Sequence, residues 1–169
     1  MQKQEGEPLF SQALSLPFFS GFGKEELHIL ASHGRAIDLP QDKEIIREGQ
    51  VAAEFYLIVE GKVEVQTQVP GRNPVTLQTL HRGDVLGWSW LTANASFAFS
   101  AKTLLPTQAL VFDGTTLLRE CEQHPRLGYL LMRRFALVMS ERLRHTRMQL
   151  LDLYAPPRNS GAFPALKKR

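Results

Sequence analysis

The fold is decided by residues 55–65, which read FYLIVEGKVEV. A run of apolar residues ends at Glu60, and after Gly61 the apolar residues Val63 and Val65 alternate with polar ones, which is typical of β-strands. Gly61 stands between two charged neighbours, a setting that suits a residue with a positive φ angle in a tight turn. The stretch therefore predicts two antiparallel strands that meet at Gly61.

Further short strands are expected on both sides of this pair. Together with it they cover residues 35–39, 44–47, 55–59, 63–69, 75–80, 96–105 and 108–112. Turn residues separate them, above all the Pro-Gly-Arg-Asn-Pro segment at 70–74 and the Gly83-Asp84 pair. Such spacing predicts a mainly β fold with flanking helices, a double-stranded β-helix or jelly roll, which we call the β-roll.

Helical patterns flank the expected strands. We expect two short helices within residues 8–33, a short helix at 114–122 capped by Asp113, and a long helix at 126–154. Residues 8–154 are thus expected to form one domain. The remaining residues, 155–169, are expected to be a disordered basic tail, because four basic residues and no acidic ones follow residue 155, whereas the rest of the chain has 16 basic and 17 acidic side chains.

Four segments in order resemble the cyclic nucleotide-binding domains of catabolite activator-like proteins. They are Glu48-Gly49 with residues 55–65, Leu80 to Gly87, Ala101-Lys102-Thr103, and Arg142-Leu143 with Thr146. The resemblance spans residues 10–154 and implies the same order of helices and β-roll. It also implies that a ligand cassette begins at Gly87, where backbone N–H groups face a cyclic phosphate, and that Thr146 is a candidate contact to the purine. As a polar residue within a helix, Thr146 equally fits a solvent-facing position or a dimer seam.

The cassette departs from the family pattern where the ligand would be held. The resemblance implies a glutamate for the ribose directly after the glycine and an arginine for the phosphate some residues later. Here the glutamate position is Trp88, and the arginine position falls at Ala95 or as far as Phe97. The candidate ligand-binding residues are Gly87, Trp88, Ser89, Trp90, Ala95, Ser96 and Phe97.

Three interpretations of this cassette remain open. Its aromatic residues, which include Phe99, close the pocket; or the pocket takes a different ligand that is planar or less anionic; or a cyclic nucleotide still binds through backbone amides, Ser89 and a cation from elsewhere such as Arg82. Between Val85 and Phe112 the only charged side chain is Lys102. Each charge-assisted hydrogen bond to a phosphate is worth about 1.5–3 kcal/mol, so losing both family contacts weakens binding by about 10²- to 10⁴-fold. We therefore expect no firmly held cofactor, and at most weak binding of cyclic AMP or cyclic GMP.

Catalytic and metal-binding patterns are not found in the sequence. Of the five histidines only His81 lies in the strand region, and no His-x-His pair occurs, so neither a metal site nor an enzyme is expected. The single cysteine, Cys121, fits a reduced, cytoplasmic protein, and no apolar stretch is long enough to span a membrane. The short stretch after residue 155 leaves no room for a helix-turn-helix module, so DNA is not expected as a partner.

The long helix is the expected output element. Ala136, Leu143 and Leu150 recur at seven-residue steps, and the resemblance implies that this helix pairs with its copy in a homodimer. The sequence thus predicts a non-catalytic regulatory or sensor domain of the cyclic nucleotide-binding type, with a degenerate cassette, that signals through its C-terminal helix. The alternative is a protein–protein interaction scaffold with a filled pocket and no ligand.

Overall fold

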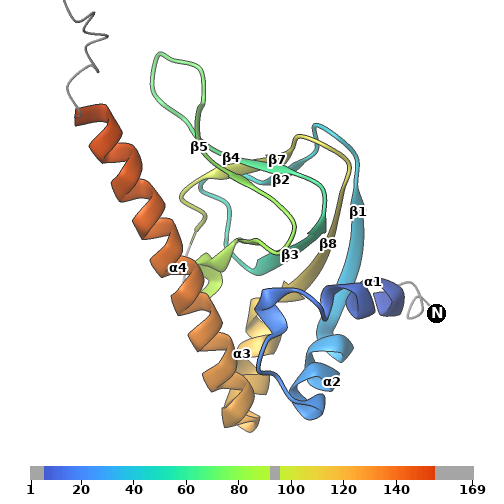
Figure 1. Cartoon of the computed structure of the whole chain (residues 1–169). Coiled ribbons are helices and arrows are strands. Elements are labelled where there is room, and N and C mark those ends of the chain that lie inside the picture. The colour runs from blue at the N-terminus through green and yellow to red at the C-terminus, as the bar shows by residue number, and fades with distance from the viewer. Residues whose placement is uncertain (1–5, 92–95, 155–169) are drawn as a thin grey trace, which may run out of the picture. The chain divides into compact units, whose positions relative to one another are not determined.

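The computed structural model describes residues 6–91 and 96–154. Eight strands form two antiparallel sheets of four, and the predicted β-roll is confirmed (Figure 1). The first sheet has the order β1-β8-β3-β6 and the second the order β2-β7-β4-β5. The strands are β1 (Gly34–Leu39), β2 (Glu44–Ile46), β3 (Glu54–Glu60), β4 (Val63–Thr67), β5 (Val75–Leu80), β6 (Val85–Leu86), β7 (Ser100–Thr103) and β8 (Thr107–Asp113).

The turn at Gly61 carries β3 of one sheet into β4 of the other. Gly61 has φ 106°, and a Cβ atom placed on it would lie 2.6 Å from the carbonyl oxygen of Pro106. A side chain at this position would therefore suffer both backbone strain and a clash, which explains why the two strands meet at a glycine.

Strand β3 has two differently buried faces. Phe55 and Leu57 point away from the roll interior, and Ile58 belongs to the apolar cluster inside it. On the outward face, the ring of Phe55 stacks on that of Phe112 with centroids 4.9 Å apart and meets Phe135 edge-on at 5.1 Å. The protein thus has one core between the sheets and a second between the first sheet and the helices.

Helices α1 (Gly6–Ala13), η1 (Pro17–Phe19) and α2 (Lys24–His33) precede the roll, and α3 (Gly114–Gln123) and α4 (Pro125–Tyr154) follow it. Asp113 caps α3 as predicted, because its carboxylate accepts a hydrogen bond of 2.7 Å from the Thr116 N–H. The contacts divide the chain into two units, Met1–Phe135 and Ala136–Arg169, so α4 begins in the first unit and ends in the second.

Several local predictions need correction. The strand predicted at 96–105 is regular only over Ser100–Thr103, and Ser96 forms an isolated bridge with Val51. The strand predicted to run from Val63 to Val69 ends at Thr67. The predicted tail at 155–169 lies outside the described residues.

Candidate functional site

The candidate cassette begins at Gly87, directly after β6, and continues into the 3₁₀ helix η2 (Trp88–Leu91). Gly87 has φ 84°, and a Cβ atom on it would lie 2.9 Å from the carbonyl oxygen of Glu54. The same atom would lie 3.3 Å from Cδ1 of Ile46 and 3.3 Å from Cε1 of Phe97. The backbone of Gly87 is therefore tightly surrounded by a carbonyl group and two apolar side chains.

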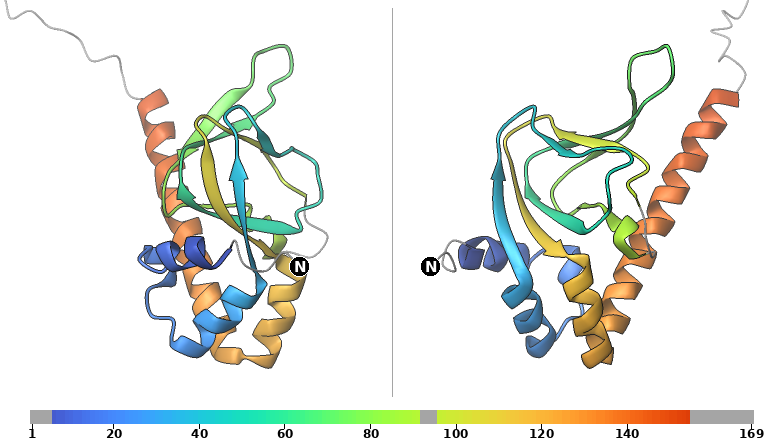
Figure 2. Two further views of the ribbon diagram at one scale, coloured as in Figure 1. Left: turned by 90° about the vertical axis from the view of Figure 1, so that its right-hand side faces the viewer. Right: turned by 180° about the vertical axis from the view of Figure 1, so that it is seen from behind.

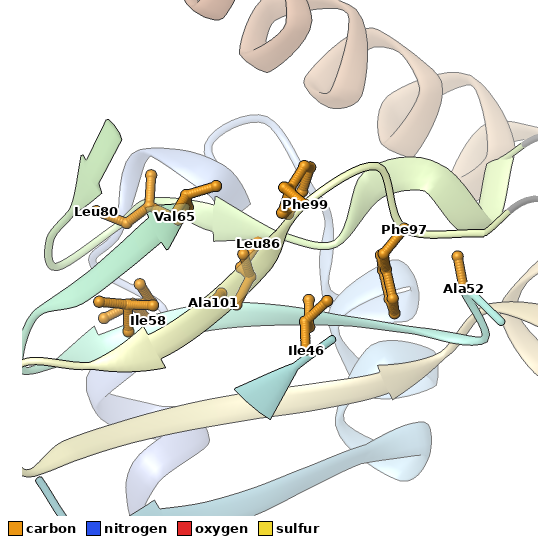
Figure 3. Packing of buried hydrophobic residues seen from close by; sticks show 10 residues of the cluster. Ile46, Ala52, Ile58, Val65, Leu80, Leu86, Phe97, Phe99 and Ala101 are labelled. Carbon is orange, nitrogen blue, oxygen red and sulfur yellow. The ribbon is translucent and has the colours of Figure 1, made fainter. Parts of the chain in front are cut away.

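Phe97 and Phe99 are part of the apolar cluster inside the roll. They are 5% and 9% exposed, and their ring centroids lie 6.3 Å apart. Figure 3 shows Phe97 among Ile46 and Ala52, with Leu86 and Ala101 nearby. Both phenylalanines thus occupy the roll interior, and the ring of Phe97 lies beside Gly87.

Trp90 lies in the second core instead. Its ring stacks on Phe55 at 5.6 Å and meets Phe135 edge-on at 5.4 Å. A Cβ atom on Gly114, the first residue of α3, would come within 2.7 Å of the Trp90 ring. Trp90 therefore joins the cassette helix η2 to the start of α3 and to the first part of α4, and does not line the roll interior.

The other candidate residues have more exposed positions. Trp88 and Ser89 are half-buried and Ser96 is exposed, while Ala95 lies outside the described residues.

Among the described residues, the indole N–H groups of Trp88 and Trp90 are buried and have no hydrogen-bond partner. Such a group loses its hydration without compensation, which costs about 1–3 kcal/mol.

The cations near the cassette are engaged elsewhere. Arg82 donates a hydrogen bond of 2.7 Å to the carbonyl oxygen of Val59 and one of 3.4 Å to the hydroxyl of Ser15. Arg82 therefore anchors its turn to β3 and to the segment after α1. Lys102 alternates with the buried residues Ala101 and Thr103 on β7, so it faces away from the roll interior.

A polar trio that we did not predict lies on the inner-facing side of β1 and β3. The Arg35 guanidinium pairs with the Glu54 carboxylate at 3.1 Å, and the Tyr56 hydroxyl donates to the same carboxylate at 2.9 Å. Burial, first, and then this hydrogen bond raise the pKa of Tyr56 above its ordinary value. The contact between Glu54 and Tyr56 could have been predicted from the sequence, because side chains alternate along a strand and Glu54, Tyr56 and Ile58 therefore share one face of β3.

Thr146 lies on the second unit, on an exposed part of α4. Its hydroxyl donates a hydrogen bond of 3.0 Å to the carbonyl oxygen of Arg142 on the preceding turn. Nearby, Glu141 pairs with Arg144 at 2.6 Å and with His145 at 3.1 Å. The basic residues of this stretch are thus partly balanced by an acid on the same helix.

Over residues 6–91 and 96–154, no group of three or more His, Cys, Asp or Glu side chains is arranged to hold a metal ion. No helix in that part of the chain is both long and apolar enough to cross a bilayer.

Comparison with known proteins finds regulatory proteins among the relatives of this chain. The curated matches include the CRP-like cAMP-activated global transcriptional regulator of Mycobacterium tuberculosis, 24% identical over 135 residues, which are 80% of this chain and 58% of that protein. The anaerobic regulatory protein of Bacillus subtilis is 28% identical over 123 residues, 72% of this chain and 50% of that protein. The chain therefore spans only 50–58% of the length of these relatives.

Solved structures show the same fold. A cyclic nucleotide-binding domain from Methylobacillus flagellatus superposes with a TM-score of 0.77 at 21% identity, covering 92% of this chain and 88% of that one. The Thermus thermophilus catabolite activator protein gives a TM-score of 0.67 at 26% identity, covering 82% and 63%.

The family model for the cyclic nucleotide-binding domain matches residues 36–124, from β1 to the end of α3. This segment is more than half of the chain and contains the β-roll except for the first two residues of β1, together with the candidate cassette. The chain belongs to the cyclic nucleotide-binding domain family.

Proposed function

We propose that this chain is a non-catalytic regulatory domain whose β-roll is closed to cyclic nucleotides by its own apolar side chains. The observation that carries the proposal is the position of Phe97, whose buried ring lies against Gly87 inside the roll. In the family, the backbone after this glycine meets the phosphate. Here the neighbouring space is filled by hydrocarbon, which cannot compensate for the lost hydration of an anion.

The charges around the cassette support the same conclusion. The family's ribose-binding and phosphate-binding positions carry Trp88 and Ala95 or Phe97, none of which is ionisable. Arg82, the cation that would substitute for the arginine, already donates to Val59 and Ser15. A cyclic nucleotide would therefore have to displace packed rings and bind without a side-chain cation.

The contacts of Trp90 provide a route from the cassette to the helices. Its ring touches Gly114 at the start of α3 and Phe135 on α4. A change at residues 87–100, caused by a partner or by a ligand unlike a cyclic nucleotide, would shift the hinge between Gly114 and Pro125 and reposition α4. We propose that α4 is the output element on this basis.

The exposed part of α4 carries apolar side chains that could pair with α4 of a second copy of the chain. Leu143 and Leu150 are 53% and 49% exposed and lie seven residues apart. Large apolar side chains that are exposed on a helix at this spacing favour pairing with a second helix. We propose a homodimer that forms through this seam, and an interaction scaffold remains the second candidate function on the same observation.

Isothermal titration of the purified chain with cyclic AMP and with cyclic GMP tests the proposal. We expect no saturable heat for the wild type, because neither ligand finds a cation or an open roll. Phe97→Ala opens the space beside Gly87, and Phe99→Ala is the matched control, since it removes a ring that is not among the atoms nearest to that glycine. Saturable binding of either nucleotide to the wild type at one ligand per chain would refute the closed roll.

A further inference from the structure

Two histidines and two glutamates meet where α2 lies beside α3. Nε2 of His33 lies 3.2 Å from Oε1 of Glu120, and Nε2 of His124 lies 3.8 Å from Oε2 of the same carboxylate. Nδ1 of His124 also lies 4.0 Å from Oε1 of Glu25. We call these four residues the Glu120 cluster. They are not arranged to hold a metal ion.

The sheet topology brings these side chains together. Strand β1 follows α2 directly, α3 follows β8 directly, and β1 pairs with β8 from Gly34 opposite Phe112. The two helices must therefore leave the same end of the sheet, and Figure 2 shows α2 and α3 side by side there. The cluster joins α2 to α3 and to His124, the residue at which the chain turns from α3 into α4.

Glu120 is largely shielded from water, since its side chain is 19% exposed. Within the described part of the chain, its ion-pair partners are the two imidazoles. Burial, first, and then the charge of Glu120 raise the pKa of the neighbouring Cys121 thiol. The carboxylate thus lies where its charge is poorly screened, and it depends on a cation for compensation.

Imidazole is the side chain whose charge ordinarily changes between about pH 5 and 8. His33 and His124 compensate Glu120 only when they carry a proton. A second link between the same elements behaves differently, because Arg126 pairs with the buried Glu26 at 2.8 Å and a guanidinium stays charged throughout this range. The corner between α3 and α4 is therefore attached to α2 in two ways. One is the permanent ion pair between Arg126 and Glu26, and the other is the Glu120 cluster, whose contacts depend on the protonation of its histidines.

We propose that the Glu120 cluster is a pH-sensitive clasp that holds α2 against the corner between α3 and α4 more firmly when His33 and His124 are protonated. Around the clasp, the other charged or titratable groups named above are the Cys121 thiol on α3 and the Arg126–Glu26 ion pair between α4 and α2. Within the cluster, Glu25 adds a second acceptor for charged His124, and the Arg126 cation is already paired with Glu26. Acidification thus tightens the segment that connects the roll to α4.

The sign of the effect follows from proton binding. A protonated imidazole attracts the Glu120 carboxylate, and a neutral imidazole does not. The contact between the histidines and Glu120 is therefore firmer when the histidines carry a proton.

Thermal unfolding of the full chain at pH 5.8 and at pH 8.0 tests the clasp. The measured quantity is the melting temperature at pH 5.8 minus that at pH 8.0. We expect this difference to be about 2–4 °C more positive for the wild type than for the double variant His33→Gln/His124→Gln. His81→Gln is the matched control, because His81 is an exposed histidine outside the cluster, and it should behave as the wild type does.

A double-mutant cycle between His33 and Glu120 keeps the test independent of overall stability. The unfolding equilibrium constants of the wild type, H33Q, E120Q and the double variant are measured in urea. We expect the coupling between His33 and Glu120 to be a factor of about two to five in this constant at pH 5.8 and to be absent at pH 8.0. Equal coupling at the two pH values, or an unchanged pH dependence in H33Q/H124Q, would overturn the proposal.

Discussion

The indole ring of Trp90 lies so close to Gly114 that a Cβ atom on the glycine would come within 2.7 Å of it. One residue belongs to the cassette helix η2 and the other begins α3. Their contact is direct, so a movement of one element changes the space available to the other. We expect this contact to set the position of α3 relative to the roll.

Gly114→Ala tests the closeness of this contact. The added methyl group must displace the Trp90 ring, and overpacking of this kind costs about 1–3 kcal/mol of the free energy of unfolding. Chemical denaturation of the wild type, G114A, Trp90→Leu and the double variant measures the cost. The smaller leucine side chain leaves room for the methyl group, so G114A should cost much less in the W90L background. Equal costs in both backgrounds would show that the two residues are not coupled.

Gly87→Ala combines backbone strain with a clash. An alanine there would hold an unfavourable φ of 84° and place its methyl group 2.9 Å from the carbonyl oxygen of Glu54. We expect a loss of about 2–4 kcal/mol in the free energy of unfolding. Gly71→Ala is the control, since Gly71 has φ 72° with no atom within 4 Å of its Cβ position, and strain alone predicts about 1–2 kcal/mol. Similar losses for the two variants would contradict the clash.

Much of the fold could be predicted because strands and turns leave local signals. The apolar runs before and after Gly61 predicted β3 and β4, and Asp113 marked the start of α3. The strand predicted at 96–105 was too long, because apolar residues continue through Phe97 and Phe99 and resemble part of the strand. There the backbone of Phe97 exchanges hydrogen bonds with Gly49 and Gln50 instead of extending the regular ladder. Periodicity shows which residues are apolar and not which partner strand pairs with them.

The site could be predicted in part. The absence of charged residues from the cassette was evident from the sequence, and so was its aromatic content. The division of those aromatics between two cores was not, because Phe97 enters the roll whereas Trp90 packs against Phe55 and Phe135. The Glu120 cluster had no sequence signal, since its residues come from α2 and from the end of α3 and meet only through sheet pairing.

Tyr56→Phe should change the behaviour of the protein in alkali. An unfolded tyrosine ionises near pH 10, whereas burial and the Glu54 carboxylate raise the pKa of Tyr56 in the native state. The native chain holds this proton more tightly than the unfolded chain does, so its stabilisation is complete below about pH 10 and declines as the pH rises further. We expect the free energy of unfolding to fall more steeply above this pH in the wild type than in Y56F.

Ultraviolet difference spectra give an independent readout of the same group. The phenolate of Tyr56 should be missing from the spectrum of the native wild type near pH 10.5 and should appear when the chain is unfolded in urea at that pH. Y56F removes this signal and identifies it. Full ionisation of Tyr56 in the native protein at its ordinary pH would contradict the contact with Glu54.

Charged substitutions on α4 test the proposed dimer seam. Leu143→Glu/Leu150→Glu places four carboxylates in the seam of a parallel pair, and we expect the dimer to dissociate at concentrations about 10–100-fold higher than for the wild type. Met148→Glu is the control, because Met148 is 51% exposed, much like Leu143 and Leu150, and falls on the opposite side of the helix from Leu150. Sedimentation velocity over a concentration series measures the dissociation constant. If M148E weakens the dimer as much as L143E/L150E does, the seam is misplaced, and if all the chains remain monomeric, α4 does not pair with its copy.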